Sequence, residues 1–111
     1  MHHGMDIPVE QKTAVLAAAD GIVEEVRDNG LGFNAVVVNH GGAVTLYGHV
    51  SDFLVREGQA VRRGQSIALS GGMPGTPGAG TLTTGPHLHF EVIVDGVNHD
   101  PLQYLPHIAG L

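Results

Sequence analysis

The sequence predicts a single, small all-β domain whose strands are mostly antiparallel. Three observations support this fold class: short segments rich in β-branched residues recur along the chain, turn signals separate them, and no stretch shows the spacing of a long helix. Seventeen glycines and six prolines among 111 residues agree with many turns. The length suits one domain over residues 1–111 with a modest core, and 42% hydrophobic with 14% charged residues is typical of a globular chain.

The first half of the chain predicts strands joined by tight turns. Residues 14–19 fit either one helical turn or a short strand. Residues 21–27 are expected to form a strand that ends at the Asp-Asn-Gly turn signal of 28–30. Residues 34–39 contain Ala-Val-Val-Val, which predicts a strand buried on both faces, and the His-Gly-Gly of 40–42 predicts the next turn.

Residues 44–50 show the alternation of a half-buried strand. The alternation separates two sets of side chains: Val44, Leu46 and Val50 against Thr45, Tyr47 and His49. It therefore predicts that His49 lies on a polar or cleft-facing side. For Tyr47, core packing is favoured over a catalytic role.

The second half repeats short strands and glycine turns. Residues 55–67 carry glycines three after each apolar residue, which predicts short strands broken by turns, and 66–69 is a further strand. Residues 71–84 hold five glycines and two prolines with almost no charge, the composition of a long functional loop. The last strand is expected over 87–94, with a turn at 95–96.

Residues 87–94 also carry the most informative pattern. Because side chains alternate between the two faces of a strand, His87 and His89 share one face. The other face is expected to enter the core: Leu88, Phe90 and Val92. Two imidazoles side by side are costly as packing but useful as a metal ligand beside a proton-handling group.

The N-terminal segment supplies two further candidate ligands. His2 and Asp6 lie four residues apart with a glycine between them, and they can converge on one ion from a bend in the chain. Together with His89 they give two nitrogen ligands and one carboxylate oxygen. Three protein ligands and one open position are typical of a catalytic zinc site, so one Zn²⁺ per chain is expected. His49 and His87 remain as proton shuttles or oxyanion donors.

Other polar residues leave alternatives open. Glu91 shares the face of the strand histidines and could orient one of them, or it could form a structural or surface pair. Asn34 is expected in a turn or in a cleft wall. His3 is expected beside the metal site rather than as a ligand, although Met1 with a free amine and His3 in third place could bind copper(II) or nickel(II). The remaining histidines are expected to be structural or exposed: His40 in a turn, and His99 and His107 on the surface.

Composition argues against some partners. The net charge is −6 and no lysine or arginine cluster is present, which disfavours nucleic acid. Cysteine is absent, so disulfides and thiolate metal ligands are excluded. No apolar run approaches the roughly 20 residues of a membrane span, and we expect no signal peptide within this chain. We expect a monomer that makes no membrane contact through this segment.

Three motifs follow one another along the chain: His2-x-Gly4-x-Asp6, Tyr47-x-His49, and Gly85-Pro86-His87-Leu88-His89-Phe90-Glu91. Supporting stretches lie between and after them: Ala18-Ala19-Asp20-Gly21-x-Val23, Gly32-Phe33-Asn34, Gly58-x-x-Val61-x-x-Gly64-Gln65, and Asp100-Pro101-x-x-Tyr104-Leu105. Together they closely resemble the lysostaphin/LytM-type zinc metallopeptidases, the M23 peptidase family, over essentially the whole chain.

The resemblance implies a LytM-like fold (duplicated hybrid motif) in which His2, Asp6 and His89 ligate zinc and His49 and His87 are the catalytic histidines. It implies hydrolysis of peptide bonds in bacterial cell-wall peptidoglycan by zinc-activated water, outside the cytoplasm. Family domains usually carry more chain before the first ligand, so this chain is expected to be cut from a longer precursor.

Two other function classes are open at this point. A catalytically silent peptidoglycan-binding or hydrolase-activating module of the same fold would keep cell-wall affinity without zinc. The glycine spacing of 55–67 also resembles that of lipoyl, biotinyl or sugar-phosphotransfer domains. A lipoyl or biotinyl carrier needs an exposed hairpin lysine, and the one lysine, Lys12, is in no such context. A phosphohistidine carrier would give His2 and Asp6 no role.

Overall fold

The computed structural model describes residues 5–29, 33–71 and 87–99, and for Met5, Asp6, His87 and His99 it describes the backbone alone. These residues form ten strands, and none of them lies in a helix, so the described part contains no helix that could cross a membrane. Every strand pair is antiparallel. The predicted all-β, antiparallel fold class is confirmed.

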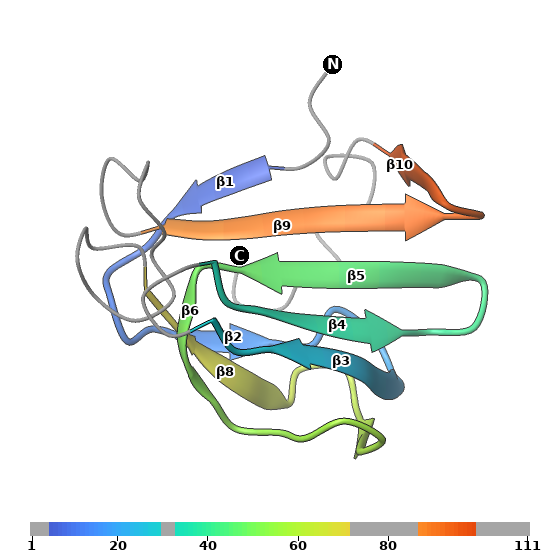
Figure 1. Ribbon diagram of the computed structural model, residues 1–111, viewed down its shortest axis with the longest axis horizontal. Coiled ribbons are helices and arrows are strands. Elements are labelled where there is room, and N and C mark those ends of the chain that lie inside the picture. Colours follow the sequence, from blue (N-terminus) through green and yellow to red (C-terminus); the bar gives the residue numbers. More distant parts are fainter. Residues whose placement is uncertain (1–4, 30–32, 72–86, 100–111) are drawn as a thin grey trace.

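Two sheets make up the described fold (Figure 1). The larger has the strand order β1-β9-β5-β4-β3-β7, with β10 paired to β9. Its strands are β1 (Met5–Pro8), β3 (Gly21–Arg27), β4 (Ala35–Asn39), β5 (Ala43–Gly48), β7 (Ala60–Val61), β9 (His87–Val94) and β10 (Val97–His99). The smaller sheet has the order β2-β8-β6, formed by β2 (Ala14–Leu16), β8 (Ser66–Ser70) and β6 (Val50–Phe53).

The main core lies between the two sheets. It joins side chains of the larger sheet to side chains of the smaller: Val23, Val36, Val38, Tyr47, Leu88, Phe90 and Val92 on one side, and Val15, Val50, Ile67 and Ala68 on the other. Phe90 and Tyr47 are fully buried and their ring centroids lie 5.4 Å apart. The prediction that Leu88, Phe90 and Val92 enter the core is therefore confirmed.

A second apolar cluster covers the outer face of the larger sheet, which is the face turned away from the smaller sheet. Ala35, Val37 and Leu46 are buried there, packed against the half-buried Phe33 and Val44. Strand β4 thus has apolar side chains on both faces, as the sequence predicted for residues 34–39. The segment that fitted either a helical turn or a strand begins with strand β2.

The predicted alternation of residues 44–50 is partly wrong. Thr45 and Tyr47 share one face, as predicted; both are buried, and Tyr47 belongs to the main core. Strand β5 ends at Gly48, and His49 adopts a left-handed backbone conformation with a φ of 61°. This bend breaks the period of two, so Val50 joins the main core on the same side as Tyr47 rather than the outer cluster of Leu46.

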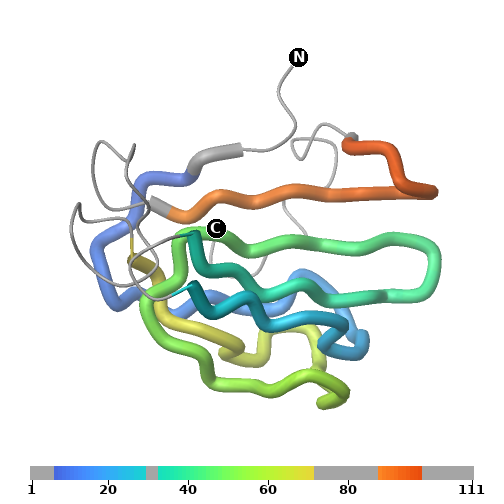
Figure 2. The backbone as a smooth tube through the Cα atoms, in the orientation of Figure 1, coloured from blue at the N-terminus to red at the C-terminus, as the bar shows by residue number. Residues whose placement is uncertain are grey.

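Two tight turns close the same end of the larger sheet (Figure 2). One joins β4 to β5 and the other joins β9 to β10. The second is the predicted turn at 95–96, where Asp95 and Gly96 have φ angles of 53° and 77°. Positive φ at both central residues suits the right-handed twist of a hairpin. Gly30, most of the 71–84 loop and the C-terminal tail from Asp100 lie outside the described residues.

The buried hydroxyl of Tyr47 is held by two polar groups. It accepts hydrogen bonds from the Ala18 N–H (2.9 Å) and from the Thr45 hydroxyl (2.7 Å). Burial raises the pKa of Tyr47 above its ordinary value of 10.0, because the ionised phenolate would lose its hydration. The predicted core role of Tyr47 is confirmed, and its polar end is satisfied.

We predict that Tyr47→Phe lowers the free energy of unfolding at neutral pH by about 1–3 kcal/mol, because the Ala18 N–H and the buried Thr45 hydroxyl lose their acceptor. The raised pKa of the folded phenol adds a pH dependence. Wild-type stability is lost as the pH rises above the unfolded pKa near 10, since only the unfolded chain then releases the proton. The difference in unfolding free energy between wild type and variant, measured by urea titration, should narrow above about pH 10. A constant difference would contradict a raised pKa of Tyr47 in the folded protein.

Candidate metal and catalytic site

The strand register brings four of the five predicted site positions together at one end of the larger sheet. His89 of β9 lies opposite Asp6 of β1 on one side and opposite Gly48 of β5 on the other. His49 follows Gly48 directly, and His87 begins β9 opposite Pro8. His2 lies outside the described residues.

The backbone of His49 is fixed on both sides of its bend. Its carbonyl oxygen accepts a hydrogen bond from the Gly71 N–H (2.7 Å), and the following Val50 N–H donates to the Asn34 carbonyl (3.4 Å). The imidazole is half-buried and lies nearly perpendicular to that of His89, with ring centroids 6.2 Å apart. The imidazole that follows β5 and the imidazole of β9 thus lie close together.

Phe33 lies beside both of these histidines. Its ring meets His49 edge-on at a centroid distance of 4.8 Å and His89 at 6.3 Å. A Cβ atom on Gly48 would lie only 2.5 Å from Cζ of Phe33, so the aromatic ring occupies the space above that glycine. Glycine at this position permits the close approach that seats Phe33 at the site.

Sequence reasoning missed this role of Phe33. The residue appeared only within a supporting stretch of the family resemblance, next to Asn34. Its position depends on the fold of the segment before β4, and no local pattern indicates that it reaches His49 and His89. Asn34, expected in a turn or a cleft wall, is 2% exposed, and its Oδ1 accepts a hydrogen bond from the Asn29 N–H at 2.6 Å.

Glu91 contacts His89 as one of the two sequence interpretations expected. Its Oε2 lies 2.8 Å from Nε2 of His89, and the two side chains are 20% and 24% exposed. A carboxylate only accepts hydrogen bonds, so Nε2 carries the proton in this contact. In the neutral imidazole the lone pair is then on Nδ1, the atom that a metal ion would use. This donor set fits a zinc site.

The other predicted histidine roles are partly tested. His40 is structural as predicted: Nδ1 lies 2.8 Å from the Asp20 carbonyl oxygen and Nε2 lies 2.7 Å from Oγ1 of Thr45. His3, His107 and the side chain of His99 are outside what the structure describes. Within the described residues, no group of three or more His, Asp or Glu side chains gathers around one point. The described residues include neither His2 nor the side chains of Asp6 and His87.

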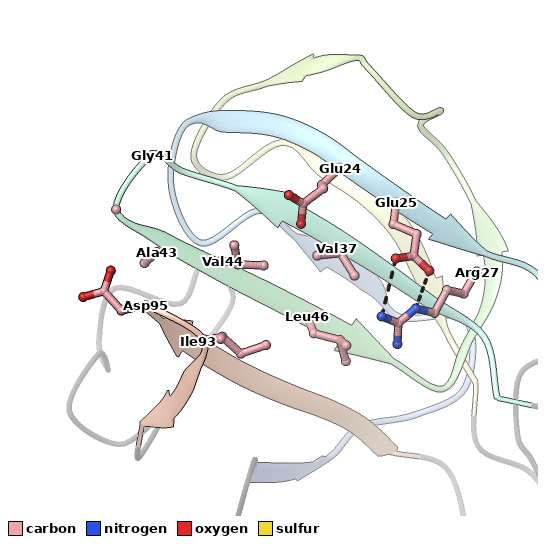
Figure 3. A pocket seen from close by; sticks show the side chains of 12 residues that line it. Glu24, Glu25, Arg27, Val37, Gly41, Ala43, Val44, Leu46, Ile93 and Asp95 are labelled. Carbon is pink, nitrogen blue, oxygen red and sulfur yellow. Dashed lines mark hydrogen bonds and ion pairs between the residues drawn. The ribbon is translucent and has the colours of Figure 1, made fainter.

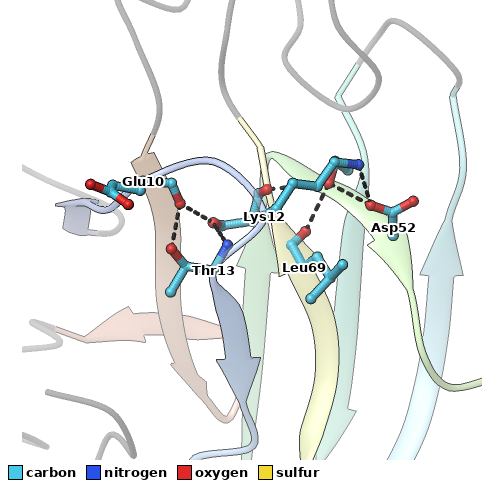
Figure 4. Close-up of polar contacts among 7 residues, drawn as sticks. Glu10, Lys12, Thr13, Asp52 and Leu69 are labelled. Atoms are coloured by element: carbon cyan, nitrogen blue, oxygen red, sulfur yellow. Dashed lines mark hydrogen bonds and ion pairs between the residues drawn. The ribbon is translucent and has the colours of Figure 1, made fainter.

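A polar network anchors the segment behind His49 (Figure 4). The backbone N–H of Lys12 donates to the Ser70 carbonyl (2.7 Å), and the Ser70 hydroxyl donates to the Glu10 carbonyl (2.9 Å). The Lys12 ammonium pairs with Asp52 and lowers the pKa of that carboxyl. Because this pair is exposed, it adds little stability. Ser70 directly precedes Gly71, whose N–H donates to the His49 carbonyl. By holding Ser70, the network also holds this donor in place.

A shallow groove lies on the outer face of the larger sheet, at the hairpin end (Figure 3). Its volume is about 410 Å³, and Val37, Leu46 and Ile93 are among the apolar residues that line it. Glu25 and Arg27 form an ion pair beside them, and the hydrogen bond from the guanidinium to Glu25 raises the pKa of Arg27. The groove shares its face with His89 but is lined by other residues.

The family of the chain follows from comparison with known proteins. Residues 1–101 match the model of peptidase family M23. The chain belongs to this family. The family resemblance drawn from the sequence is therefore confirmed.

Three relatives illustrate the similarity. The peptidoglycan DD-endopeptidase ShyA of Vibrio cholerae is 43% identical over 96 residues, which are 86% of this chain and 21% of that protein. A zinc-containing peptidase from Vibrio cholerae superposes with a TM-score of 0.76 and 38% identity, over 88% of this chain and 28% of the other. The catalytic domain of lysostaphin from Staphylococcus simulans gives a TM-score of 0.74 and 31% identity, over 95% and 79%. The chain therefore spans about a fifth of the length of ShyA.

We predict that Gly48→Ala destabilises the protein by about 1–3 kcal/mol, because the added methyl group must displace the Phe33 ring. Gly42→Ala is the matched control, since a Cβ there would meet nothing within 4 Å. Chemical denaturation of both variants measures the difference. Equal stabilities would mean that Phe33 does not occupy the space above Gly48.

Proposed function

We propose that this chain is a zinc metalloendopeptidase that hydrolyses peptide bonds in bacterial cell-wall peptidoglycan. The observation that carries the proposal is the row formed by Asp6, His89 and Gly48 across three strands, with His49 directly after it. This row lies in a chain of peptidase family M23, among relatives that include a peptidoglycan DD-endopeptidase and a zinc-containing peptidase.

His2, Asp6 and His89 would hold one zinc ion. Imidazole nitrogen and carboxylate oxygen are ordinary zinc ligands, and three of them leave a position open for substrate or water. Zinc bound there supplies Lewis acidity at the scissile carbonyl and activates water. The register that places Asp6 opposite His89 supports two members of this set, since directly opposed residues of an antiparallel pair are close neighbours.

His49 and His87 would handle protons and steady the oxyanion. A histidine can remove a proton from the attacking water and return it to the leaving amine. The second imidazole can donate a hydrogen bond to the tetrahedral oxyanion. Phe33 packs edge-on against His49 and holds its ring, while its apolar surface excludes water from one side of the pair.

The proposal places the domain outside the cytoplasm, where its peptidoglycan substrate is, and treats it as a monomer. The main rival is a silent peptidoglycan-binding or hydrolase-activating module, which would retain the fold without metal and without cleavage. The lipoyl or biotinyl carrier is disfavoured, because Lys12 lies between strands of different sheets rather than in a hairpin. A mass increase after incubation with a phosphoenolpyruvate-dependent phosphotransfer system would instead support a phosphohistidine carrier.

We predict one zinc ion per chain in the purified, untagged protein and its loss in His89→Ala and Asp6→Ala. Elemental mass spectrometry measures the zinc, and digestion of purified peptidoglycan followed by chromatography measures cleavage. His40→Asn is the control, because His40 contacts Asp20 and Thr45 rather than the site. Zinc-free wild-type protein that still binds cell walls after zinc is added would favour the silent module.

We also predict that peptidoglycan cleavage is lost at acid pH. Ligand imidazoles and carboxylates must be deprotonated to bind metal, so protons compete with zinc. Release of new amino groups can be followed across a pH series at fixed ionic strength. A rate that stays flat down to about pH 4 would contradict a site built on histidine ligands.

A further inference from the structure

Two consecutive hydrogen bonds connect the last hairpin to His89. The side-chain amide of Asn98 donates to Oε1 of Glu91 at 2.8 Å, and Oε2 of the same carboxylate lies 2.8 Å from Nε2 of His89. Both oxygens of Glu91 are thus engaged, one on each side. All three side chains are only partly exposed, so solvent competes weakly for these bonds.

The hairpin sets the position of Asn98. His89 and Glu91 are two residues apart on β9 and share a face, whereas Asn98 is on β10 opposite Ile93. This register follows from the Asp95–Gly96 turn, whose positive φ angles fix the pairing of the two strands. Asn98 therefore reaches Glu91 from a neighbouring strand, and the three residues form a line along the sheet.

The same sheet contains a comparable pair without a histidine. The amide of Asn39 on β4 donates to Oε1 of Glu24 on β3 at 3.2 Å. That pair is an ordinary cross-strand contact and has no imidazole at its other end among the contacts described. The pair at Glu91 differs in being shorter and in ending on a candidate metal ligand.

We propose that Asn98 and Glu91 are positioning residues that hold His89 as the Nε2–H tautomer and direct its Nδ1 atom toward the metal. Asn98 keeps the carboxylate in place, and the carboxylate accepts a hydrogen bond from Nε2–H and makes the imidazole a stronger donor to the metal. The role toward zinc rests on the proposed function. The tautomer of His89 does not, because it is a property of the metal-free protein.

The first test is zinc affinity, measured by competition with a fluorescent chelator at fixed pH. Glu91→Gln and Glu91→Ala should weaken zinc binding by about 10–100-fold, the range typical of such supporting residues. Asn98→Ala should weaken it in the same direction, and in the double variant the losses should be non-additive because both act through one carboxylate. The controls Glu24→Gln and Asn39→Ala should bind like wild type. Unchanged affinity in folded Glu91 variants would overturn the proposal.

The second test needs no metal. Long-range ¹H–¹⁵N NMR of the histidine side chains in metal-free protein should show His89 as the Nε2–H tautomer, and Glu91→Ala should lose this preference while Glu24→Ala keeps it. An Nδ1–H or mixed tautomer in the wild type would overturn the proposal. If the wild type binds no zinc but shows the tautomer, the proposed peptidase function fails and the positioning role stands. Unfolding midpoints of every variant confirm that the folded protein is compared.

Discussion

The pairing of β9 on both of its edges is the constraint on which the fold and the site depend. Strand β9 bonds to β1 along one edge and to β5 along the other. One set of its residues enters the main core: Leu88, Phe90 and Val92. A slip of one residue would exchange that set with the polar residues of the outer face. Burial of the apolar set therefore maintains the register that places His89 opposite Asp6 and Gly48.

The second constraint is the bend at His49. A non-glycine residue in the left-handed region costs of the order of 1–3 kcal/mol, and it persists only where its surroundings hold it. Here the hydrogen bond from Gly71, the bond from Val50 to Asn34, and the edge-on contact with Phe33 do so. The bend ends β5 and starts β6, so one residue both joins the two sheets and carries a candidate catalytic imidazole.

Much of this arrangement follows from sequence patterns, and the exceptions have physical reasons. The alternation in β9 predicted its core and its outer face because a regular strand has a strict period of two. The same rule grouped Val50 with Val44 and Leu46, which was wrong, because the bend at His49 breaks the period and turns Val50 into the main core beside Tyr47. Phe33 and Asn98 reach the site across strands, and such contacts depend on register and turn geometry that no local pattern encodes.

Charge balance connects the proposed metal with its supporting residues. The chain carries a net charge of −6. The Glu91 carboxylate is only 20% exposed, so it lacks much of its hydration. On the proposed assignment, Asp6 and Glu91 are both neighbours of His89. Asp6, opposite His89 on β1, is a zinc ligand, and Glu91, on the same strand as His89, accepts its hydrogen bond. Their two negative charges balance the two positive charges of zinc, which is the largest local charge in such a site. Glu91 in turn makes the imidazole of His89 a stronger donor to the zinc ion. The hairpin turn at Asp95 and Gly96, though distant from the reacting bond, would then contribute to metal affinity by holding Asn98 against that carboxylate.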